Sequence, residues 1–258
     1  MLWVVKLALL VYVGFGALLY VAQRGLMYLP VAENLADDVP HERIAVDGAI
    51  LKVWVVDPGN EHAVIYFGGN AEDVYYNAAD FRRHLPDTSV YLVNYRGYGG
   101  STGSPSEATL FADALRLFDR LSPRHTRVAV IGRSLGSGVA AYLAAERPVE
   151  RVVLITPQDS AAAVAKRLYP VYPIDWMLKD KYDNIAYAPR ITVPVQVVIA
   201  ADDRIIPPGH SERLLQAFAH EPVERVVIEG AGHNTISAFD GYWQAIAAFL
   251  APRTGAAD

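Results

Sequence analysis

The distribution of hydrophobic positions divides the chain into two unequal parts. From Leu7 to Ala22 the residues are apolar or glycine, without a single charge. From about residue 40 onward, short apolar runs alternate with longer amphipathic stretches. Short strands that alternate with helices are typical of a largely parallel sheet with helices on both faces. The pattern predicts an α/β domain over residues 40–258, preceded by a hydrophobic segment over 1–22 and a linker over 23–39.

The predicted sheet has eight strands. Asp47-Gly48 is a turn signal between the first two apolar runs, so the sheet is expected to begin with an antiparallel hairpin. The remaining runs are continuous and rich in Val and Ile, as in strands that are buried on both faces. The predicted strands are residues 43–46, 51–56, 63–67, 90–94, 128–131, 152–155, 195–200 and 225–228.

Helical patterns lie between these strands. Ser104-Pro105-Ser106-Glu107 is interpreted as a capping box with proline at the first helical position, opening a helix that ends near Leu121. Residues 159–193 contain no strand pattern and are rich in Tyr and Pro, so we expect this insertion to form a small cap. The other predicted helices are residues 72–85, 135–146, 208–217 and 237–250.

The N-terminal segment is long enough to cross a membrane. As a helix, residues 1–22 rise about 33 Å, which matches a hydrocarbon core of about 30 Å, and Lys6 can reach the headgroups. A cleaved signal peptide is the main alternative, but apolarity continues past the small residues Gly14 and Gly16. These glycines also argue against a buried core helix. A single-pass membrane anchor is predicted, with nearly balanced positive charges on its two sides and therefore no predicted orientation.

Composition excludes several classes of function. The net charge is −5 and no Lys/Arg-rich run is present, so the electrostatic footprint of a nucleic-acid-binding protein is missing. The chain has no cysteine, which excludes disulfides, thiolate metal sites and a cysteine nucleophile. The hydrophobic fraction of 52% is sufficient for a large core.

The first candidate for chemistry is the segment Gly132-Arg133-Ser134-Leu135-Gly136. It follows a predicted strand and precedes a predicted helix of small residues, which is the context in which G-x-S-x-G forms a nucleophile elbow. The glycines permit a strained turn and close packing of the helix, and the serine hydroxyl is left accessible. Ser134 is therefore the predicted nucleophile.

A serine hydroxyl needs a base that is held by a third group. In this fold the order along the chain is Ser, acid, His, and both partners are expected to follow strands. Asp203 comes after the strand over 195–200 and His233 comes after the strand over 225–228. Asp202 and Asp159 are alternative acids. The other histidines, His41, His62, His84, His125, His210 and His220, are interpreted as surface residues.

An oxyanion hole requires backbone N–H groups aimed at the developing negative charge. One donor is expected from Leu135, the residue after the nucleophile. The strand over 63–67 ends in Gly68-Gly69-Asn70, whose glycines permit a close approach of backbone to ligand. The N–H group of Asn70 is the predicted second donor.

Together these segments resemble the membrane-anchored α/β-hydrolase-domain serine hydrolases, which include animal depalmitoylating enzymes and uncharacterised bacterial members. The family pattern is F-H-G-N-A, Y-R-G-Y-G-x-S, G-x-S-x-G, D-x-x-V-P and a final G-H. The corresponding segments here are residues 67–71, 95–101, 132–136, 203–207 and 232–233, with glycine in place of the usual histidine at position 68. The resemblance implies an α/β-hydrolase fold and hydrolysis of esters or thioesters, and it supports Asp203 as the acid.

The predicted reaction is acyl transfer to Ser134 followed by hydrolysis, with a small-molecule or lipid-like acyl substrate and no metal or organic cofactor. Tyr169, Tyr172 and Trp176 of the cap either line an acyl pocket or form the core of the cap. A peptidase of the same fold and a non-catalytic binding protein are the alternatives. No catalytic residue is predicted before residue 68, so the N-terminal segment is expected to be dispensable for hydrolysis of small water-soluble esters.

Overall fold

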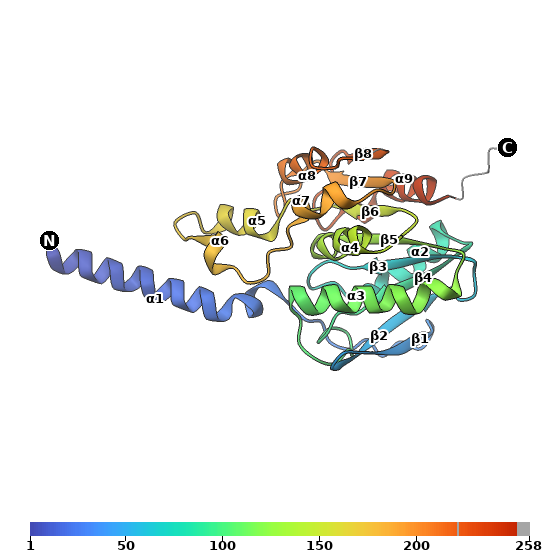
Figure 1. Cartoon of the computed structure of the whole chain (residues 1–258), viewed down its shortest axis with the longest axis horizontal. Helices are drawn as coiled ribbons and strands as arrows, with labels where there is room; N and C mark the ends of the chain where they lie inside the picture. Colours follow the sequence, from blue (N-terminus) through green and yellow to red (C-terminus); the bar gives the residue numbers. More distant parts are fainter. Residues whose placement is uncertain (221, 252–258) are drawn as a thin grey trace.

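A computed structural model describes residues 1–220 and 222–251 of the chain, and its central feature is one mixed β-sheet. Its strands are β1 His41–Val46, β2 Ala49–Val56, β3 His62–Phe67, β4 Thr88–Val93, β5 Arg127–Arg133, β6 Val152–Ile155, β7 Val195–Ala200 and β8 Val223–Ile228. The spatial order is β1-β2-β4-β3-β5-β6-β7-β8 (Figure 1). β2 is antiparallel to both β1 and β4, and the other neighbours are parallel. The predicted eight-stranded, mostly parallel sheet is confirmed.

Helices cover both faces of this sheet (Figure 1). They are α2 Ala78–His84, α3 Glu107–Leu121, α4 Leu135–Glu146, α8 Pro208–Leu215 and α9 Asp240–Leu250, with 3-10 turns η1 Val74–Asn77, η2 Ser122–Arg124, η3 Ala188–Arg190 and η4 Ile236–Ala238. Alternate residues of a strand enter opposite cores, as the period of two requires. Ile65 of β3 belongs to the core that lies under α3, α4 and α8, whereas Tyr66 belongs to the core that lies under α2 and α9.

Three helix starts differ from their predicted positions. The helix predicted over 237–250 is α9, which starts at Asp240 after the 3-10 turn η4. The predicted helix over 72–85 consists of η1 followed by α2, because the Asp73 carboxylate accepts a hydrogen bond from Tyr75 N–H at 3.2 Å and opens a 3-10 turn. The helix predicted to start at Pro105 is α3, which starts two residues later. Ser106 is its N-cap and forms a capping box with Thr109.

The cap, residues 159–193, contains α5 Ala161–Leu168, α6 Ile174–Met177 and α7 Asn184–Tyr187. α5 begins at Ala161, because Ser160 is its N-cap and the Ser160 hydroxyl accepts a hydrogen bond from Ala163 N–H at 3.0 Å. The part of the cap that contains α5 and α6 projects from the domain on the same side as the N-terminal helix (Figure 1). The cap is therefore placed to contact that helix.

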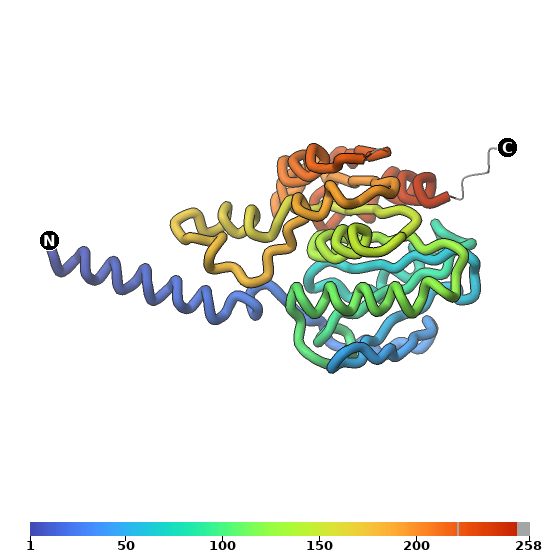
Figure 2. Tube along the Cα trace, in the orientation of Figure 1, coloured from blue at the N-terminus to red at the C-terminus, as the bar shows by residue number. Residues whose placement is uncertain are grey.

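The N-terminal helix, α1 Leu2–Met27, projects away from the sheet (Figure 2). It ends five residues beyond the predicted segment, because Gln23 and Arg24 are held in the last turns by bonds to the cap. Its most apolar 18-residue window has a mean hydropathy of 2.2 and is 6% buried. By length and composition α1 can cross a membrane, and a signal sequence would have the same properties.

Candidate active site

The turn between β5 and α4 carries Ser134. Its backbone has φ 50° and ψ −114°, a region that non-glycine residues rarely adopt at a cost of about 1–3 kcal/mol. Ser134 N–H donates to the carbonyl of Ile155 in β6 at 2.9 Å, which ties the turn to the neighbouring strand. Because of this strained conformation, Ser134 belongs to neither β5 nor α4, and its hydroxyl lies at the end of the strand.

The two glycines of this turn are required sterically. A Cβ atom at Gly132 would overlap the backbone of Gly136, one turn further on. A Cβ atom at Gly136 would overlap the carbonyl of Phe67 at the end of β3. The start of α4 therefore lies directly against the end of β3. This contact brings the loop after β3 next to Ser134.

Ser134, His233 and Asp203 lie in one chain of hydrogen bonds. His233 Nε2 is 2.9 Å from Ser134 Oγ, and His233 Nδ1 is 2.6 Å from Asp203 Oδ2. The second oxygen, Asp203 Oδ1, accepts the backbone N–H groups of Ile205 and Ile206 at 2.9 and 2.8 Å. Asp203 and His233 are both buried. The structure thus brings the three predicted residues together, each from the end of a different strand.

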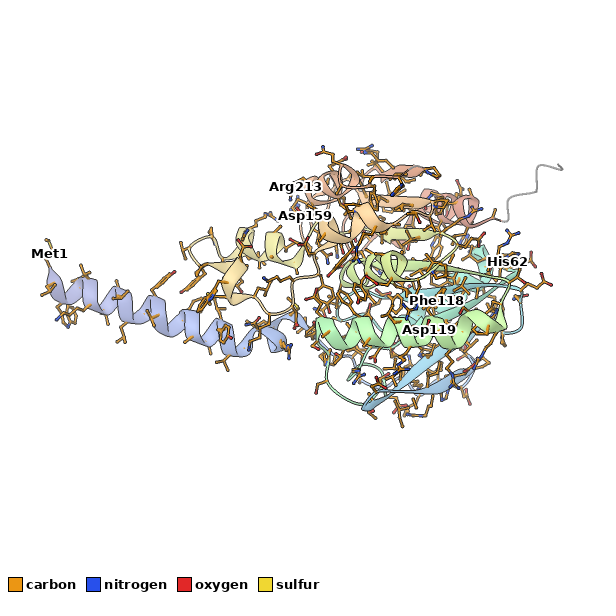
Figure 3. All side chains as sticks on the ribbon, viewed as in Figure 1. Met1, His62, Phe118, Asp119, Asp159 and Arg213 are labelled. Atoms are coloured by element: carbon orange, nitrogen blue, oxygen red, sulfur yellow. The ribbon has the colours of Figure 1, made fainter. Side chains whose placement is uncertain are left out.

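The two alternative acids lie elsewhere. Asp202 is exposed. Asp159 is buried and accepts hydrogen bonds from His210 Nδ1 and Arg213 Nε, both at 2.7 Å (Figure 3). The interpretation of His210 as a surface residue was wrong: it is 6% exposed, because α8 turns it inward onto Asp159. The contacts of Asp159 with His210 and Arg213 hold the cap to α8.

The loop after β3 is held beside the nucleophile. Gly69 faces Ser134, since a Cβ atom built on it would lie 3.6 Å from Ser134 Cβ. Among the residues that the structure describes, neither Asn70 N–H nor Leu135 N–H donates to another protein group. Both predicted oxyanion donors are therefore free to bind a ligand beside Ser134. Asn70, Ser134 and Leu135 line the same cavity.

Two tyrosines to which the motifs gave no role form hydrogen bonds with this loop. The hydroxyl of Tyr95 donates to the Gly68 carbonyl at 2.7 Å, and that of Tyr98 donates to Asn70 Oδ1 at 2.8 Å. Burial raises the pKa of Tyr98 to about 12 and raises that of Tyr95 well above its ordinary value, so both remain hydrogen-bond donors at neutral pH. The Tyr-Arg-Gly-Tyr segment therefore holds residues 68–70 after β3, which we call the oxyanion loop, by one bond to its backbone and one to the Asn70 side chain.

A second polar support comes from Glu72 and Arg133. Glu72 Oε2 accepts Gly69 N–H at 2.6 Å and lies 3.5 Å from an Arg133 guanidinium nitrogen. The same guanidinium donates to the backbone carbonyl of His233 at 3.2 Å. Arg133, the variable residue before the nucleophile, thus links the oxyanion loop with the histidine loop.

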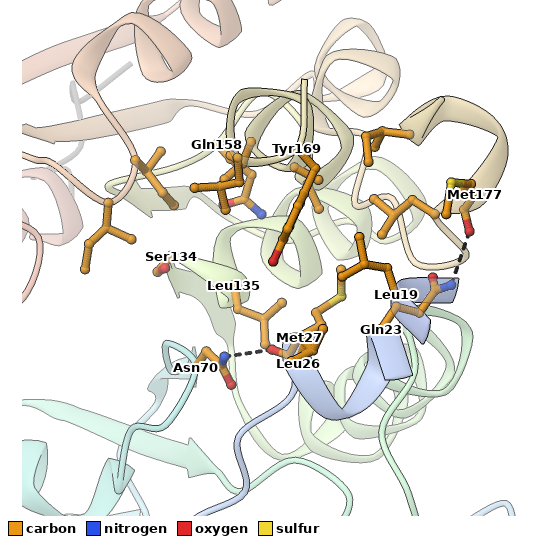
Figure 4. Close-up of a pocket in the computed structure, with 18 of the residues that line it drawn as sticks. Leu19, Gln23, Leu26, Met27, Asn70, Ser134, Leu135, Gln158, Tyr169 and Met177 are labelled. Carbon is orange, nitrogen blue, oxygen red and sulfur yellow. Dashed lines mark hydrogen bonds between the residues drawn. The ribbon is translucent and has the colours of Figure 1, made fainter. Parts of the chain in front are cut away.

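The side chain of Asn70 joins the oxyanion loop to α1. Its Nδ2 donates to the carbonyl of Met27 at 2.7 Å, and its Oδ1 accepts Leu29 N–H at 2.9 Å. Figure 4 shows the first of these bonds next to Ser134. The end of the N-terminal helix is therefore in direct contact with the site.

A cavity of about 430 Å³ opens from Ser134 toward the cap. Its lining is mostly apolar and comes from α1, from the loops around Ser134 and Ile206, and from the cap (Figure 4). Tyr169 lines this cavity, as expected if the cap aromatics form an acyl pocket. Tyr172 and Trp176 are outside the lining: Tyr172 stacks on Tyr12 of α1, and Trp176 points away with 84% of its surface exposed.

No group of three or more His, Cys, Asp or Glu side chains with metal-binding geometry is found within residues 1–220 and 222–251. The polar groups around Ser134 instead form the hydrogen-bonded chain described above. The arrangement places a serine, a histidine, an aspartate and two free N–H groups beside an apolar cavity.

Comparison with known proteins gives consistent results. A family model described as alpha/beta hydrolase fold matches residues 62–184. An uncharacterized protein of Mycobacterium tuberculosis is 37% identical over 92% of this chain and 90% of its own length. Alpha/beta hydrolase domain-containing protein 17B of Xenopus laevis is 30% identical over 75% of this chain and 68% of its own.

Among solved structures, the esterase Pf2001 of Pyrococcus furiosus has a TM-score of 0.69 at 20% identity, covering 86% of this chain and 97% of that one. A monoacylglycerol lipase of Paleococcus ferrophilus has a TM-score of 0.63 at 19% identity, covering 78% and 98%. At these identities the likeness establishes the same fold.

Proposed function

The chain belongs to the α/β-hydrolase family, and from that premise we propose that it is a membrane-anchored serine hydrolase that cleaves acyl esters or thioesters. The observation that carries the proposal is the hydrogen-bonded chain from Ser134 through His233 to Asp203, with the serine on a strained turn. A binding protein would gain nothing from holding a serine at such a backbone cost next to an oriented histidine.

The geometry supports a two-step mechanism. The Ser134 hydroxyl attacks the acyl carbonyl carbon while His233 Nε2 accepts its proton, and the N–H groups of Asn70 and Leu135 stabilise the oxyanion. His233 then returns the proton to the leaving alcohol or thiol, which leaves an acyl-Ser134 ester. Water attacks this ester with His233 again as the base, and the carboxylic acid is released. Asp203 keeps the imidazole in the tautomer whose Nε2 accepts protons.

The cavity favours an acyl group over a peptide. Leu19, Leu26, Val164, Leu168 and Ile206 are among its lining residues, and no ionised side chain is in the lining within the described part of the chain. A peptidase that binds a chain terminus would need a charged group there. The esterase and lipase of the same fold support this choice of reaction class.

α1 is proposed to anchor the enzyme in a membrane. Large apolar side chains are exposed along almost the whole helix, including Leu2, Leu9, Val13, Leu18 and Val21. Burying that many side chains, each contributing about 1.5–3 kcal/mol, exceeds the membrane affinity of a single lipid chain. A carbonate wash of membranes combined with N-terminal sequencing distinguishes an uncleaved anchor from a signal peptide.

An active-site-directed fluorophosphonate tests the nucleophile. The full-length protein in detergent is expected to be labelled, and Ser134→Ala is expected to lose labelling and at least about 10⁴-fold in turnover of p-nitrophenyl butyrate. Ser104→Ala is the matched control, because Ser104 is exposed and distant in sequence from the elbow. Labelling of a folded Ser134→Ala protein would refute the assignment. A panel of p-nitrophenyl esters, acyl thioesters and amino-acid amides then separates the substrate classes.

A further inference from the structure

The cavity at Ser134 is enclosed by two structures that the sequence analysis treated as separate. One wall is the cap, through residues such as Val164, Tyr169 and Met177. The opposite wall is the last two turns of α1, through Leu19, Tyr20, Gln23, Leu26 and Met27 (Figure 4). The proposed anchor therefore forms part of the substrate-binding cavity.

The tip of the cap, residues 168–178, packs along α1 well beyond the cavity. Tyr172 stacks on Tyr12 with ring centroids 4.7 Å apart, and the Tyr12 hydroxyl donates to the Val171 carbonyl at 2.9 Å. Gly16 leaves room for the Tyr172 ring, since a Cβ atom there would lie 2.9 Å from it. At the other end Gln23 Nε2 donates to the Met177 carbonyl. From Tyr12 to Gln23 the contact runs roughly 16 Å along the helix axis.

The outer surface of this cap tip is apolar. Leu168, Val171 and Trp176 are 64%, 69% and 84% exposed, although each is large and hydrophobic. They adjoin the exposed apolar surface of α1, because the tip lies against that helix. Clustered apolar exposure of this kind is unusual on a face that meets water and is typical of a membrane-binding surface.

The backbone of the tip is also suited to a medium without water. From Tyr169 to Leu178 two residues are prolines, which have no N–H, and six of the other eight donate backbone hydrogen bonds within the cap. Unsatisfied N–H groups are what excludes irregular segments from hydrocarbon. Of the nearby charges, Lys166 and Asp175 form an ion pair with each other at 2.7 Å, and the Lys179 ammonium lies 4.3 Å from the centre of the Tyr20 ring of α1. Arg167 is exposed next to the start of the tip, and its long side chain can reach the headgroups.

We propose that the cap tip is immersed in the bilayer together with α1, and that the cavity between them receives a long acyl chain directly from the hydrocarbon layer. The substrate class is then a long-chain acyl ester or thioester that remains in the membrane while its carbonyl reaches Ser134. The second half of the proposal rests on the proposed function. The first half, the depth of the cap tip, does not depend on catalysis.

The required depth fits within one leaflet. Transmembrane helices tilt by up to about 40°, and at that tilt a 16 Å length of α1 spans roughly 12 Å along the membrane normal. One leaflet contributes about 15 Å of hydrocarbon. Arg24 and Asp180, which pair at 2.8 Å, then lie at the headgroup level, where a charged pair meets water and lipid phosphates.

Spin labels test the depth, and the chain is suited to this because it contains no cysteine. Val171→Cys and Trp176→Cys, labelled with a nitroxide in phosphatidylcholine–phosphatidylglycerol vesicles, are expected to be more accessible to oxygen than to a water-soluble nickel complex. Leu10→Cys in α1 is the reference for a site inside the bilayer. Glu61→Cys is the aqueous one, since it precedes His62 at the end of the domain opposite to Met1 (Figure 3). Cap labels that behave like Glu61→Cys would overturn the proposal.

Two neighbouring leucines of α1 test the path of the acyl chain. Leu19 lines the cavity, whereas Leu18 is 59% exposed and is outside the lining. Leu19→Trp fills the cavity and is expected to lower kcat/KM for a C16 ester at least tenfold more than for a C4 ester. Leu18→Trp, at the same depth, is expected to keep the wild-type ratio of the two.

The outcomes separate the two proposals. If wild-type protein neither reacts with the fluorophosphonate nor cleaves either ester, the proposed function fails. If it cleaves both esters and Leu19→Trp leaves their ratio within twofold of wild type, the proposed function stands and the path along α1 is refuted.

Discussion

The Asp203 carboxylate has different partners on its two oxygens, which makes Asp203→Asn a sharp test of the triad. Oδ2 lies 2.6 Å from His233 Nδ1, and Oδ1 accepts two backbone N–H groups, from Ile205 and Ile206. Asparagine has the same shape, but one of its two ends is a hydrogen-bond donor. Either orientation of the amide must therefore break something.

If the amide oxygen keeps the two N–H groups, the NH₂ group faces His233 Nδ1. Nδ1 must then accept, the ring proton moves to Nε2, and Nε2 no longer accepts the proton of Ser134. If the amide is reversed, the tautomer is kept but two N–H groups lose their acceptor, at about 1–3 kcal/mol each. The first orientation is favoured by roughly 2–6 kcal/mol. We expect kcat to fall about 10⁴-fold, or some 5.5 kcal/mol in activation free energy.

The assay is hydrolysis of p-nitrophenyl butyrate by full-length protein in detergent, with kcat determined for Asp203→Asn and Asp202→Asn. Asp202 is the matched control because it is adjacent and exposed, and its variant is expected to stay within about twofold of wild type. Thermal denaturation confirms that both variants are folded. A loss below tenfold in folded Asp203→Asn, or a larger loss in Asp202→Asn, would refute the reasoning.

Three further variants probe the supports of the site. Gly136→Ala places a methyl group on the Phe67 carbonyl, so it is expected to cost about 1–3 kcal/mol of stability, seen as a lower Tm, and to weaken fluorophosphonate labelling. Asn70→Ala keeps the backbone donor but releases the oxyanion loop from α1, so kcat is expected to fall about 10- to 100-fold. A change confined to KM would argue against this role. Burial raises the pKa of Asp159, but hydrogen bonds from His210 and Arg213 outweigh burial and hold that pKa below its ordinary value. These bonds therefore stabilise the fold fully above about pH 4, and they stabilise it less as the pH falls and the carboxylate is protonated. Asp159→Asn should therefore lower Tm at pH 7, by about 2–4 °C for each kcal/mol lost in a chain of this size, and by less at pH 3, with kcat unchanged at pH 7. Equal shifts at both pH values would contradict this.

The parts predicted well from sequence are those that local patterns determine. Continuous Val/Ile runs mark strands covered on both faces, and β6 and β7 begin and end at the predicted residues. The elbow was predictable for the same reason, since Gly132 and Gly136 are needed by contacts only a few residues away or one strand over. The start of a helix is harder to place. The capping box expected at Ser104 forms at Ser106, because the Thr109 side chain accepts a hydrogen bond from the Ser106 N–H group.

The polar supports were not predictable, because their partners are far apart in sequence. Arg133 reaches the carbonyl of His233, and the Tyr95 hydroxyl reaches Gly68, over separations that no spacing rule covers. His210 was misread for this reason too. Its helix looks amphipathic and solvated until Asp159, on another strand end, is brought against it.

The largest difference concerns the role of α1. Treated as an anchor and a linker, it was expected to be dispensable for small water-soluble esters. A truncated protein that starts at Gln23 keeps the carbonyl of Met27 for Asn70, so hydrolysis of a C4 ester is expected to survive. It loses Leu19 from the cavity wall, so the preference for long chains should disappear. A protein whose chain starts at Tyr28 after proteolytic removal of an N-terminal tag also loses the Met27 bond, and its kcat for the C4 ester should fall as in Asn70→Ala. Equal activity of the two truncated proteins would mean that α1 holds the enzyme at the membrane without shaping its site.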